Sequence, residues 1–264
     1  MISKRLTLIA LTSVLFAASA RAERPAPGAA EQNEQLTLAP GKLILNAVLE
    51  ANLSKSLAFK PVSLAPDLWY GATDDLTVGL VHSSLGATGF LGGVGDSLCL
   101  TGTSNGCAHL YNDVGADVRY RLMAPLVVDG GLFILDIKNP FWLAVKVGLD
   151  GRWRFDRIAL EAMPSIFFGL TNRSLGNKDV LSIPLTGSYD VNDKVTVSLQ
   201  TGVQLRFEQT SDNYRIPLAL AGRYQLTREL GLGLAFTLPA LLGASRTLHG
   251  FDARTLMLGG TYAF

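Results

Sequence analysis

The chain has 264 residues, of which 48% are hydrophobic and 17% charged, and its formal net charge is +1 at pH 7. A charge so close to zero gives no electrostatic basis for binding nucleic acid, so we expect no nucleic-acid partner. Beyond the N-terminal segment, no stretch of about 18 apolar residues is free of charges and turn residues, which argues against a transmembrane helix. No helical amphipathic segment of useful length is present either. The composition therefore favours a membrane β-barrel over a soluble enzyme.

The first 41 residues divide into two parts. Lys4 and Arg5 precede an apolar run over residues 6–18, which is followed by an A-x-A site at residues 20–22. This arrangement predicts a secretory signal peptide over residues 1–22, cleaved near Ala22, and a mature protein in an oxidising compartment. Residues 23–41 are rich in Pro, Ala, Glu and Gln and lack periodicity, so we expect a flexible periplasmic leader there.

From residue 42 to the end of the chain, apolar residues recur with a period of two, which is typical of β-strands. About twelve strands are predicted, an even number, as bacterial single-chain membrane barrels require. They are 42–53, 61–72, 75–83, 113–122, 125–135, 141–154, 157–170, 180–190, 194–207, 215–226, 230–239 and 252–264.

The connections between these strands alternate in length. Short turns are expected at 73–75, 123–124, 155–156, 192–193 and 227–229, and longer polar or Gly-rich links at 84–112, 136–140, 171–179, 208–214 and 240–251. Membrane barrels with both termini in the periplasm have short periplasmic turns and longer external loops. Sorted connections of this kind favour a transmembrane barrel over residues 42–264 rather than a soluble sandwich.

Strand 194–207 shows the two faces most clearly. Its odd-numbered positions from Val195 to Phe207 are mainly apolar, and its even-numbered positions are mainly polar, among them Gln200 and Arg206. We expect the apolar face to contact lipid and the polar face to line the lumen. Aromatic residues near strand ends are expected to form the periplasmic girdle. They are Tyr70, Tyr120, Trp153, Phe155, Tyr189, Tyr224 and Tyr262.

The last strand alternates up to the terminal residue, with Tyr262 and Phe264 on one face. A terminal aromatic residue with a second one two positions earlier resembles the closing strand of bacterial outer-membrane β-barrels, in which it is the assembly signal. The resemblance covers residues 42–264 and implies an all-β, antiparallel up-and-down transmembrane barrel of about 12 strands in the outer membrane. It implies outer-membrane lipids and the barrel assembly machinery as partners.

The inward parity of such a barrel would carry charges of both signs. Because an unpaired charge in a dry lumen costs several kcal/mol, we expect these side chains to be paired or hydrated. Either they line a solute pathway or they form an ion-pair network that braces the barrel. The predicted lumen-lining residues are Glu50, Asp67, Asp117, Arg119, Arg121, Asp129, Lys146, Asp150, Arg152, Glu161, Arg206 and Arg223.

The longest external loop, 84–112, holds Cys99 and Cys107, which are the only cysteines of the chain. In an exported protein, this even count at short spacing predicts a disulfide. The loop would be either a lid folded over or into the pore or a stabilised surface loop, and the second interpretation is slightly favoured. A metal site is not expected, because the two cysteines and His109 lack zinc-ligand spacing.

One pair of residues raises the possibility of catalysis. His82 and Ser84 share a face, the lipid side by parity with the preceding strand, and they resemble the His-x-Ser pair of outer-membrane phospholipases and lipid A deacylases. There the His is the base and the Ser the nucleophile, and Asn112 or Asp113 could orient the His. The resemblance ends with this pair, since Leu85 and Gly86 follow where the family motif continues differently.

The sequence therefore predicts a non-enzymatic outer-membrane channel or transporter that passes small solutes through a charged lumen, with no cofactor and no bound metal. Two alternatives stay open. One is a lipid hydrolase that uses His82 and Ser84, and the other is a closed structural or adhesion barrel that acts through its external loops.

Overall fold

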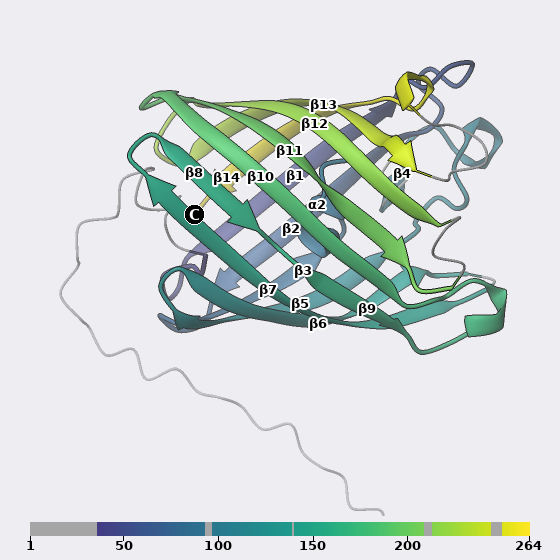
Figure 1. Ribbon diagram of the computed structural model, residues 1–264, viewed down its shortest axis with the longest axis horizontal. Helices are drawn as coiled ribbons and strands as arrows, with labels where there is room; N and C mark the ends of the chain where they lie inside the picture. Colours follow the sequence, from purple (N-terminus) through teal and green to yellow (C-terminus); the bar gives the residue numbers. More distant parts are fainter. Residues whose placement is uncertain (1–35, 93–96, 139, 209–212, 244–249) are drawn as a thin grey trace, which may run out of the picture.

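A computed structural model of the chain describes residues 36–92, 97–138, 140–208, 213–243 and 250–264 (Figure 1). The expected signal peptide and residues 23–35 of the expected leader lie outside the described residues. The strands form one antiparallel barrel. Its wall has twelve strand positions, which we call staves, and β8 and β9 together fill one of them. In chain order the strands are β1 Leu43–Asn52, β2 Val62–Gly71, β3 Leu76–Val81, β5 Val114–Met123, β6 Leu126–Asp136, β7 Trp142–Phe155, β8 Ile158–Ala162, β9 Ser165–Gly169, β10 Val180–Asn192, β11 Val195–Arg206, β12 Tyr214–Gln225, β13 Leu230–Gly243 and β14 Thr255–Ala263.

Each stave pairs with the staves before and after it in the chain, and β1 closes the barrel by pairing with both β2 and β14. The predicted all-β fold and the strand count of twelve are thereby confirmed, with most strand ends within three residues of the predicted ones. The seventh predicted strand, 157–170, is interrupted between β8 and β9 at Met163 and Pro164. Proline has no N–H to donate to a sheet, which explains the break. Among the described residues, no helix is long and apolar enough to cross a membrane.

The two faces of the staves differ as the alternation predicts. On the outer surface, many large apolar side chains are exposed. Examples are Leu199, Leu220 and Leu234, which are 52–62% exposed. Inward neighbours such as Gln200 and Thr237 are buried. An apolar outer surface of this width is typical of a transmembrane β-barrel.

The two ends of the barrel are distinct, and we call them the turn end and the loop end. The turn end carries the short connections and the chain's C-terminus, and the loop end carries the longer ones (Figure 1). At the turn end, Tyr120, Trp153, Tyr189, Tyr224 and Tyr262 are exposed on the outer surface, where the girdle is predicted. The rings of Tyr262 and Phe264 meet edge to face, with their centroids 4.7 Å apart.

Residues 36–41, the last part of the expected leader, are in contact with the barrel at the turn end. The main-chain N–H of Leu38 donates to the Thr77 hydroxyl at 2.7 Å, and the hydroxyl of buried Thr37 accepts a hydrogen bond from Arg121. The side chain of Leu38 packs against a buried cluster that includes Trp69. This segment is therefore held against the inner wall of the barrel.

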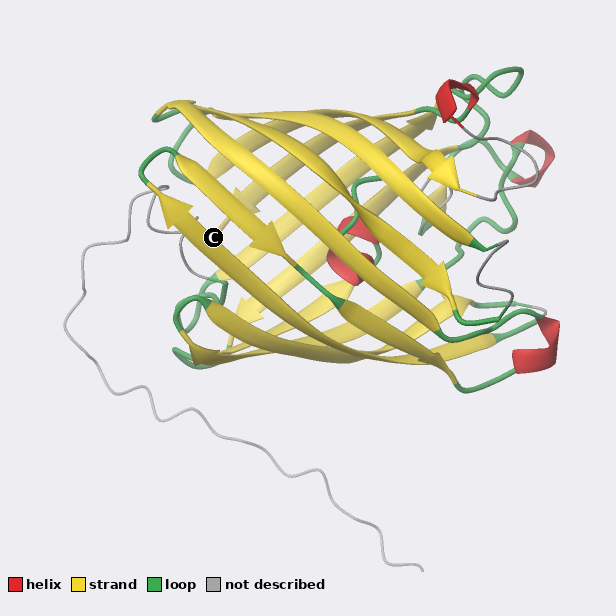
Figure 2. Ribbon diagram, viewed as in Figure 1, coloured by secondary structure: helices red, strands yellow, loops and turns green. Residues whose placement is uncertain are grey.

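The loop between β3 and β5 has two parts with different positions. Its first part contains helix α2, Ser84–Thr88, which lies inside the barrel (Figure 2). Its second part contains β4, Leu98–Cys99, the 3-10 helix η1, Thr103–Asn105, and a disulfide between Cys99 and Cys107. Because β4 pairs with Ser63 and Leu64 of β2, this second part is held against the loop end of the wall.

Two further 3-10 helices lie at the loop end. They are η2, Arg173–Leu175, between β9 and β10, and η3, Gly250–Asp252, which precedes β14.

Candidate functional site

The lumen is crossed by residues 83–92, which we call the inserted segment. It begins where β3 ends, and Asp67 on β2 holds its first residues against the wall. The carboxylate of Asp67 accepts hydrogen bonds from the main-chain N–H groups of His82 and Ser83, at 2.7 and 2.8 Å, and from the Ser83 hydroxyl. The Ser83 oxygen in turn accepts the N–H of Gly86 at 2.9 Å and so caps α2. A buried carboxylate thereby turns the chain inward.

The other end of the inserted segment is held by Gln200 on β11. The side-chain oxygen of Gln200 accepts the N–H of Leu91 at 2.7 Å, and its amide nitrogen donates to the carbonyl of Gly89 at 2.9 Å and to the Thr186 hydroxyl at 3.0 Å. Gly89 has a φ of 78°, a conformation that glycine adopts readily, and it ends the helix. The segment therefore spans the lumen from β2 to β11.

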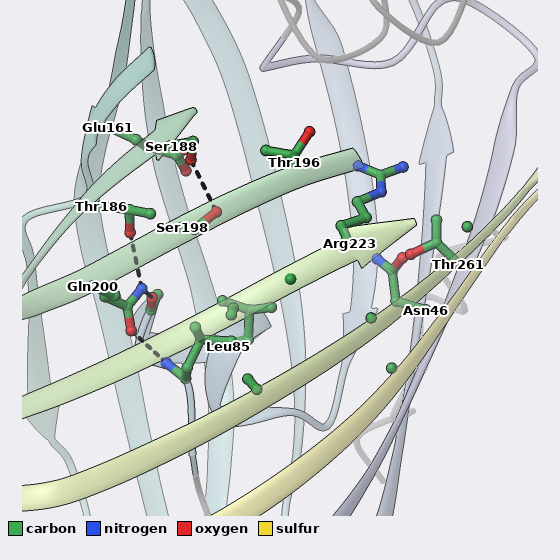
Figure 3. Close-up of a pocket in the computed structure, with 18 of the residues that line it drawn as sticks. Asn46, Leu85, Glu161, Thr186, Ser188, Thr196, Ser198, Gln200, Arg223 and Thr261 are labelled. Carbon is green, nitrogen blue, oxygen red and sulfur yellow. Dashed lines mark hydrogen bonds between the residues drawn. The ribbon is translucent and has the colours of Figure 1, made fainter. Parts of the chain in front are cut away.

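The inserted segment is close to two cavities. The turn cavity, of about 480 Å³, is lined by residues at the turn end of the strands, by Leu85 and Leu91 of the segment, and by the side chains drawn in Figure 3. The loop cavity, of about 680 Å³, is lined by residues near the loop end, among them His82, Ser84 and Arg215. The segment is thus a constriction between two open parts of one lumen.

Charged side chains are concentrated in the turn cavity. Of the described residues that line it, five are arginines and three are carboxylates, namely Arg119, Arg152, Arg154, Arg157, Arg223, Asp67, Glu161 and Asp190. Each carboxylate is engaged by the protein. Glu161 accepts the Nε–H of Arg152 at 2.7 Å, Asp190 forms an ion pair with Arg154, and Asp67 holds the inserted segment. The guanidinium of Arg119 lies 4.0 Å from the centroid of the Trp69 ring, a cation–π contact.

A second group of charges is closed off within the wall. The ammonium group of Lys146 forms ion pairs with Asp129 and, at 3.0 Å, with Asp117, and all three residues are 3% exposed or less. Glu50 and Asp150 are buried as well. A solute in the lumen cannot touch these groups, so this cluster acts as a brace, whereas the arginines of the turn cavity are partly accessible.

The twelve predicted lumen residues thus divide into residues that line the turn cavity, residues that are buried in the wall, and two residues at the ends of the barrel. Asp67, Arg119, Arg152, Glu161 and Arg223 line the turn cavity, whereas Glu50, Asp117, Asp129, Lys146 and Asp150 are buried. Arg121 donates a hydrogen bond to Thr37 and forms an ion pair with Asp75 at the turn end, and Arg206 is exposed at the loop end of β11.

Arg154, Arg157 and Asp190 were not among the predicted lining residues, and Gln200 was predicted on the lumen face but not as an anchor of the inserted segment. Arg154 shares parity with Arg152, so alternation alone would have found it. Arg157 follows β7 in a turn, and Gln200 looks in the sequence like any other inward polar residue.

The structure does not bring His82 and Ser84 into a catalytic arrangement. The two ring nitrogens of His82 contact the carbonyl of Pro66, at 2.5 Å, and the Tyr111 hydroxyl, at 2.8 Å. The Ser84 hydroxyl lies 3.4 Å from that of Thr88. The expectation that both residues face lipid is wrong for Ser84, because the chain leaves β3 after Val81 and turns into the lumen.

Asn112 and Asp113, which were considered as groups that could orient His82, form hydrogen bonds with other residues. Asn112 accepts the N–H of His109 at 2.9 Å, and Asp113 accepts that of Ser97 at 3.2 Å.

The predicted disulfide between Cys99 and Cys107 is present. The loop that carries it combines the two expectations, because residues 84–92 are folded into the pore and the cysteines lie outside the constriction. His109 lies 3.4 Å from the carboxylate of Asp136. Over the described part of the chain, no group of three or more His, Cys, Asp or Glu side chains is placed to hold a metal ion.

Comparisons with known proteins extend these observations. No protein-family model and no curated protein matches the sequence. Solved structures do match. The NanC porin aligns with a TM-score of 0.55 and 10% identity, covering 83% of this chain and 98% of its own. The COG4313 outer-membrane channel from Pseudomonas putida F1 has a TM-score of 0.52 and 14% identity, covering 86% and 97%. The KdgM porin aligns with a TM-score of 0.50 and 9% identity, covering 84% of this chain and 99% of its own. The chain therefore has the fold of bacterial outer-membrane channels.

Proposed function

We propose that the protein is an outer-membrane channel for small solutes, and that it favours anions. One observation carries the proposal: the turn cavity is lined by five arginines against three carboxylates, and two of those carboxylates are already in ion pairs with Arg152 and Arg154. An anion that enters this cavity can contact Arg223 or Arg119 directly. A cation finds no carboxylate that is free of protein partners among the described lining residues.

The inserted segment supports a selective pathway rather than a wide pore. A twelve-stranded barrel is intermediate between small barrels filled by side chains and large water-filled porins. Here the segment narrows the lumen between the two cavities, so a passing solute is brought close to the lining side chains. At such short range, rings of charged side chains set the selectivity of a pore. The folds similar to this one belong to proteins described as porins and channels.

On this proposal the barrel lies in the outer membrane with its turn end in the periplasm. The signal peptide is removed near Ala22, and Tyr262 and Phe264 present the last strand to the barrel assembly machinery. The exposed apolar staves contact the outer-membrane lipids.

The test is the ion current of the refolded, oxidised protein in a planar lipid bilayer with a potassium chloride gradient. We expect discrete conductance steps and a reversal potential whose sign indicates chloride preference. Arg223→Gln should lower the ratio of chloride to potassium permeability. Lys194→Gln is the matched control, since it removes a cation from an exposed turn outside the cavity and should leave the ratio unchanged. Absence of steps would contradict the channel, and potassium preference would contradict the anion selectivity.

A further inference from the structure

Part of the turn cavity is apolar, which the passage of small ions does not require. Val48 of β1, Ala235 of β13 and Met257 of β14 form a buried cluster on the inner wall, and Leu91 of the inserted segment packs against it. All four side chains line the turn cavity. We call this group the apolar patch. It faces the space that the arginines also face.

Leu85 extends this apolar lining. It lies on α2, inside the barrel, and yet 38% of it is exposed, in the turn cavity (Figure 3). Ala87 of the same helix packs against the buried cluster around Trp69, so α2 already has an apolar contact with the wall. The exposure of Leu85 is therefore not needed to attach the helix. An apolar side chain held in this way gains free energy when a ligand covers it.

A cationic group lies between the apolar patch and the turn end of the lumen, and its side chain extends toward the turn end. Arg223 is two residues from Ala221, which packs against the patch, and both are on β12. Its side chain lies across the neighbouring strand, since a Cβ atom at Gly231 would be 3.2 Å from the Arg223 Nε atom. Asn46 and Thr261, paired across β1 and β14, add an amide and a hydroxyl to the same part of the cavity (Figure 3).

We infer that the turn cavity is a binding site for a small organic monocarboxylate with an apolar tail. The carboxylate lies at Arg223, and the tail lies against the apolar patch and Leu85. A volume of about 480 Å³ is in the range of small-molecule sites, and an apolar wall with a few placed polar groups is their usual composition. The inference rests on the proposed function only in that the ligand reaches the cavity through the lumen.

Three probes separate the contribution of the carboxylate from that of the apolar tail. Hexanoate has the carboxylate and a tail, acetate has the carboxylate alone, and hexanamide has the tail without the charge. Calorimetric titration of the refolded, oxidised full chain in detergent micelles measures the affinity for each probe without requiring an ion current. We expect hexanoate to bind at least about tenfold more tightly than either of the others, which corresponds to about 1.4 kcal/mol.

Two glycines on β14 provide matched variants. Gly259 lines the cavity beside Met257, and a Cβ atom added there would come no nearer than 4.0 Å to the nearest protein atom. Gly260 has the opposite parity, and nothing lies within 4 Å of an added Cβ atom. Gly259→Leu should fill the site and abolish the preference for hexanoate, whereas Gly260→Leu should retain it. The pair also controls for hexanoate that partitions into the micelle.

Arg223→Gln should reduce hexanoate binding to the level of hexanamide. The inference is overturned if hexanoate binds no more tightly than acetate, or if Gly259→Leu and Gly260→Leu bind it equally. Such a result leaves the channel proposal intact when conductance steps are present. Conversely, a barrel without conductance that still binds hexanoate with the expected preference would contradict the channel proposal alone.

Discussion

The carboxylate of Asp67 receives two hydrogen bonds from Ser83, one from the main-chain N–H at 2.8 Å and one from the hydroxyl. This contact joins the inner face of β2 to the first turn of the helix that crosses the lumen. Both residues are buried, and hydrogen bonds to a charged group contribute about 1.5–3 kcal/mol each. The inserted segment is therefore held firmly at this end. Whether it can move within the lumen depends on the contacts at its other end, which Gln200 makes.

At that other end, we predict that Gln200→Ala increases the conductance. The substitution removes two hydrogen bonds to the inserted segment, worth about 1–3 kcal/mol together. The ratio of released to anchored segment should therefore rise about 5- to 150-fold, which single-channel recording detects as longer or larger openings. Gln204→Ala is the control, because Gln204 is on the same face of β11 but bonds to Ser182. Equal effects of the two substitutions would mean that the segment does not limit the current.

The buried Lys146 should be important for stability rather than for selectivity. Lys146→Met leaves the carboxylates of Asp117 and Asp129 buried without their counter-ion, and breaking a buried pair in this way costs about 3–5 kcal/mol. Urea unfolding of the reconstituted protein measures the loss. Lys178→Met serves for comparison, since its partner Glu208 is 61% exposed and the pair should contribute no more than about 1 kcal/mol. Adding Asp117→Asn to Lys146→Met should recover part of the loss.

The disulfide should stabilise the protein without controlling the pore. Replacing Cys99 and Cys107 with serine removes a short cross-link, which on the chain-entropy model contributes about 2–3 kcal/mol. The constriction, residues 83–92, lies outside the cross-linked loop, so we expect an unchanged single-channel conductance. Thermal unfolding and planar-bilayer recording of the same preparation test the two halves of the prediction. A larger conductance after reduction would show that the cross-linked loop also obstructs the lumen.

Stability should fall as the pH rises from about 4 to about 7, because of Asp113. Burial, assisted by the charges of Asp67 and Glu50 and opposed by the N–H of Ser97, raises the pKa of Asp113 from 3.8 to about 7. The folded state thus holds the proton more tightly than the unfolded chain does. This contribution is complete below the unfolded pKa and is lost as the pH passes through the folded pKa. Asp113→Asn should remove this component of the pH profile in urea unfolding, and an unaltered profile would contradict the assignment.

The strands could be predicted from the sequence because each stave is in a two-sided environment, with apolar side chains on its outer face and mainly polar ones toward the lumen. That environment imposes strict alternation, as in Val195 to Phe207, and alternation is a local property. The break between β8 and β9 also had a local signal, Pro164, in the middle of the seventh predicted strand. The even strand number and the sorted connections then determined the topology.

The inserted segment could not be predicted in the same way. Its position depends on Asp67 and Gln200, which lie on opposite sides of the barrel and resemble other inward polar residues in the sequence. The capping serine, Ser83, indicates a helix start but not where the helix lies. For the same reason, parity placed charged residues on the inner face but did not separate the accessible Arg223 from the buried Lys146. That difference is decided by what packs over each side chain.

The two anchors of the inserted segment also differ in the length of chain that each one closes. Ser83 is 16 residues from Asp67, whereas Leu91 is 109 residues from Gln200. Contacts between nearby residues close small loops and form early, and those that join distant residues form late. We therefore expect α2 to be folded against the β2–β3 hairpin while the C-terminal strands are still being added. The later strands would then assemble around a helix that is already in place.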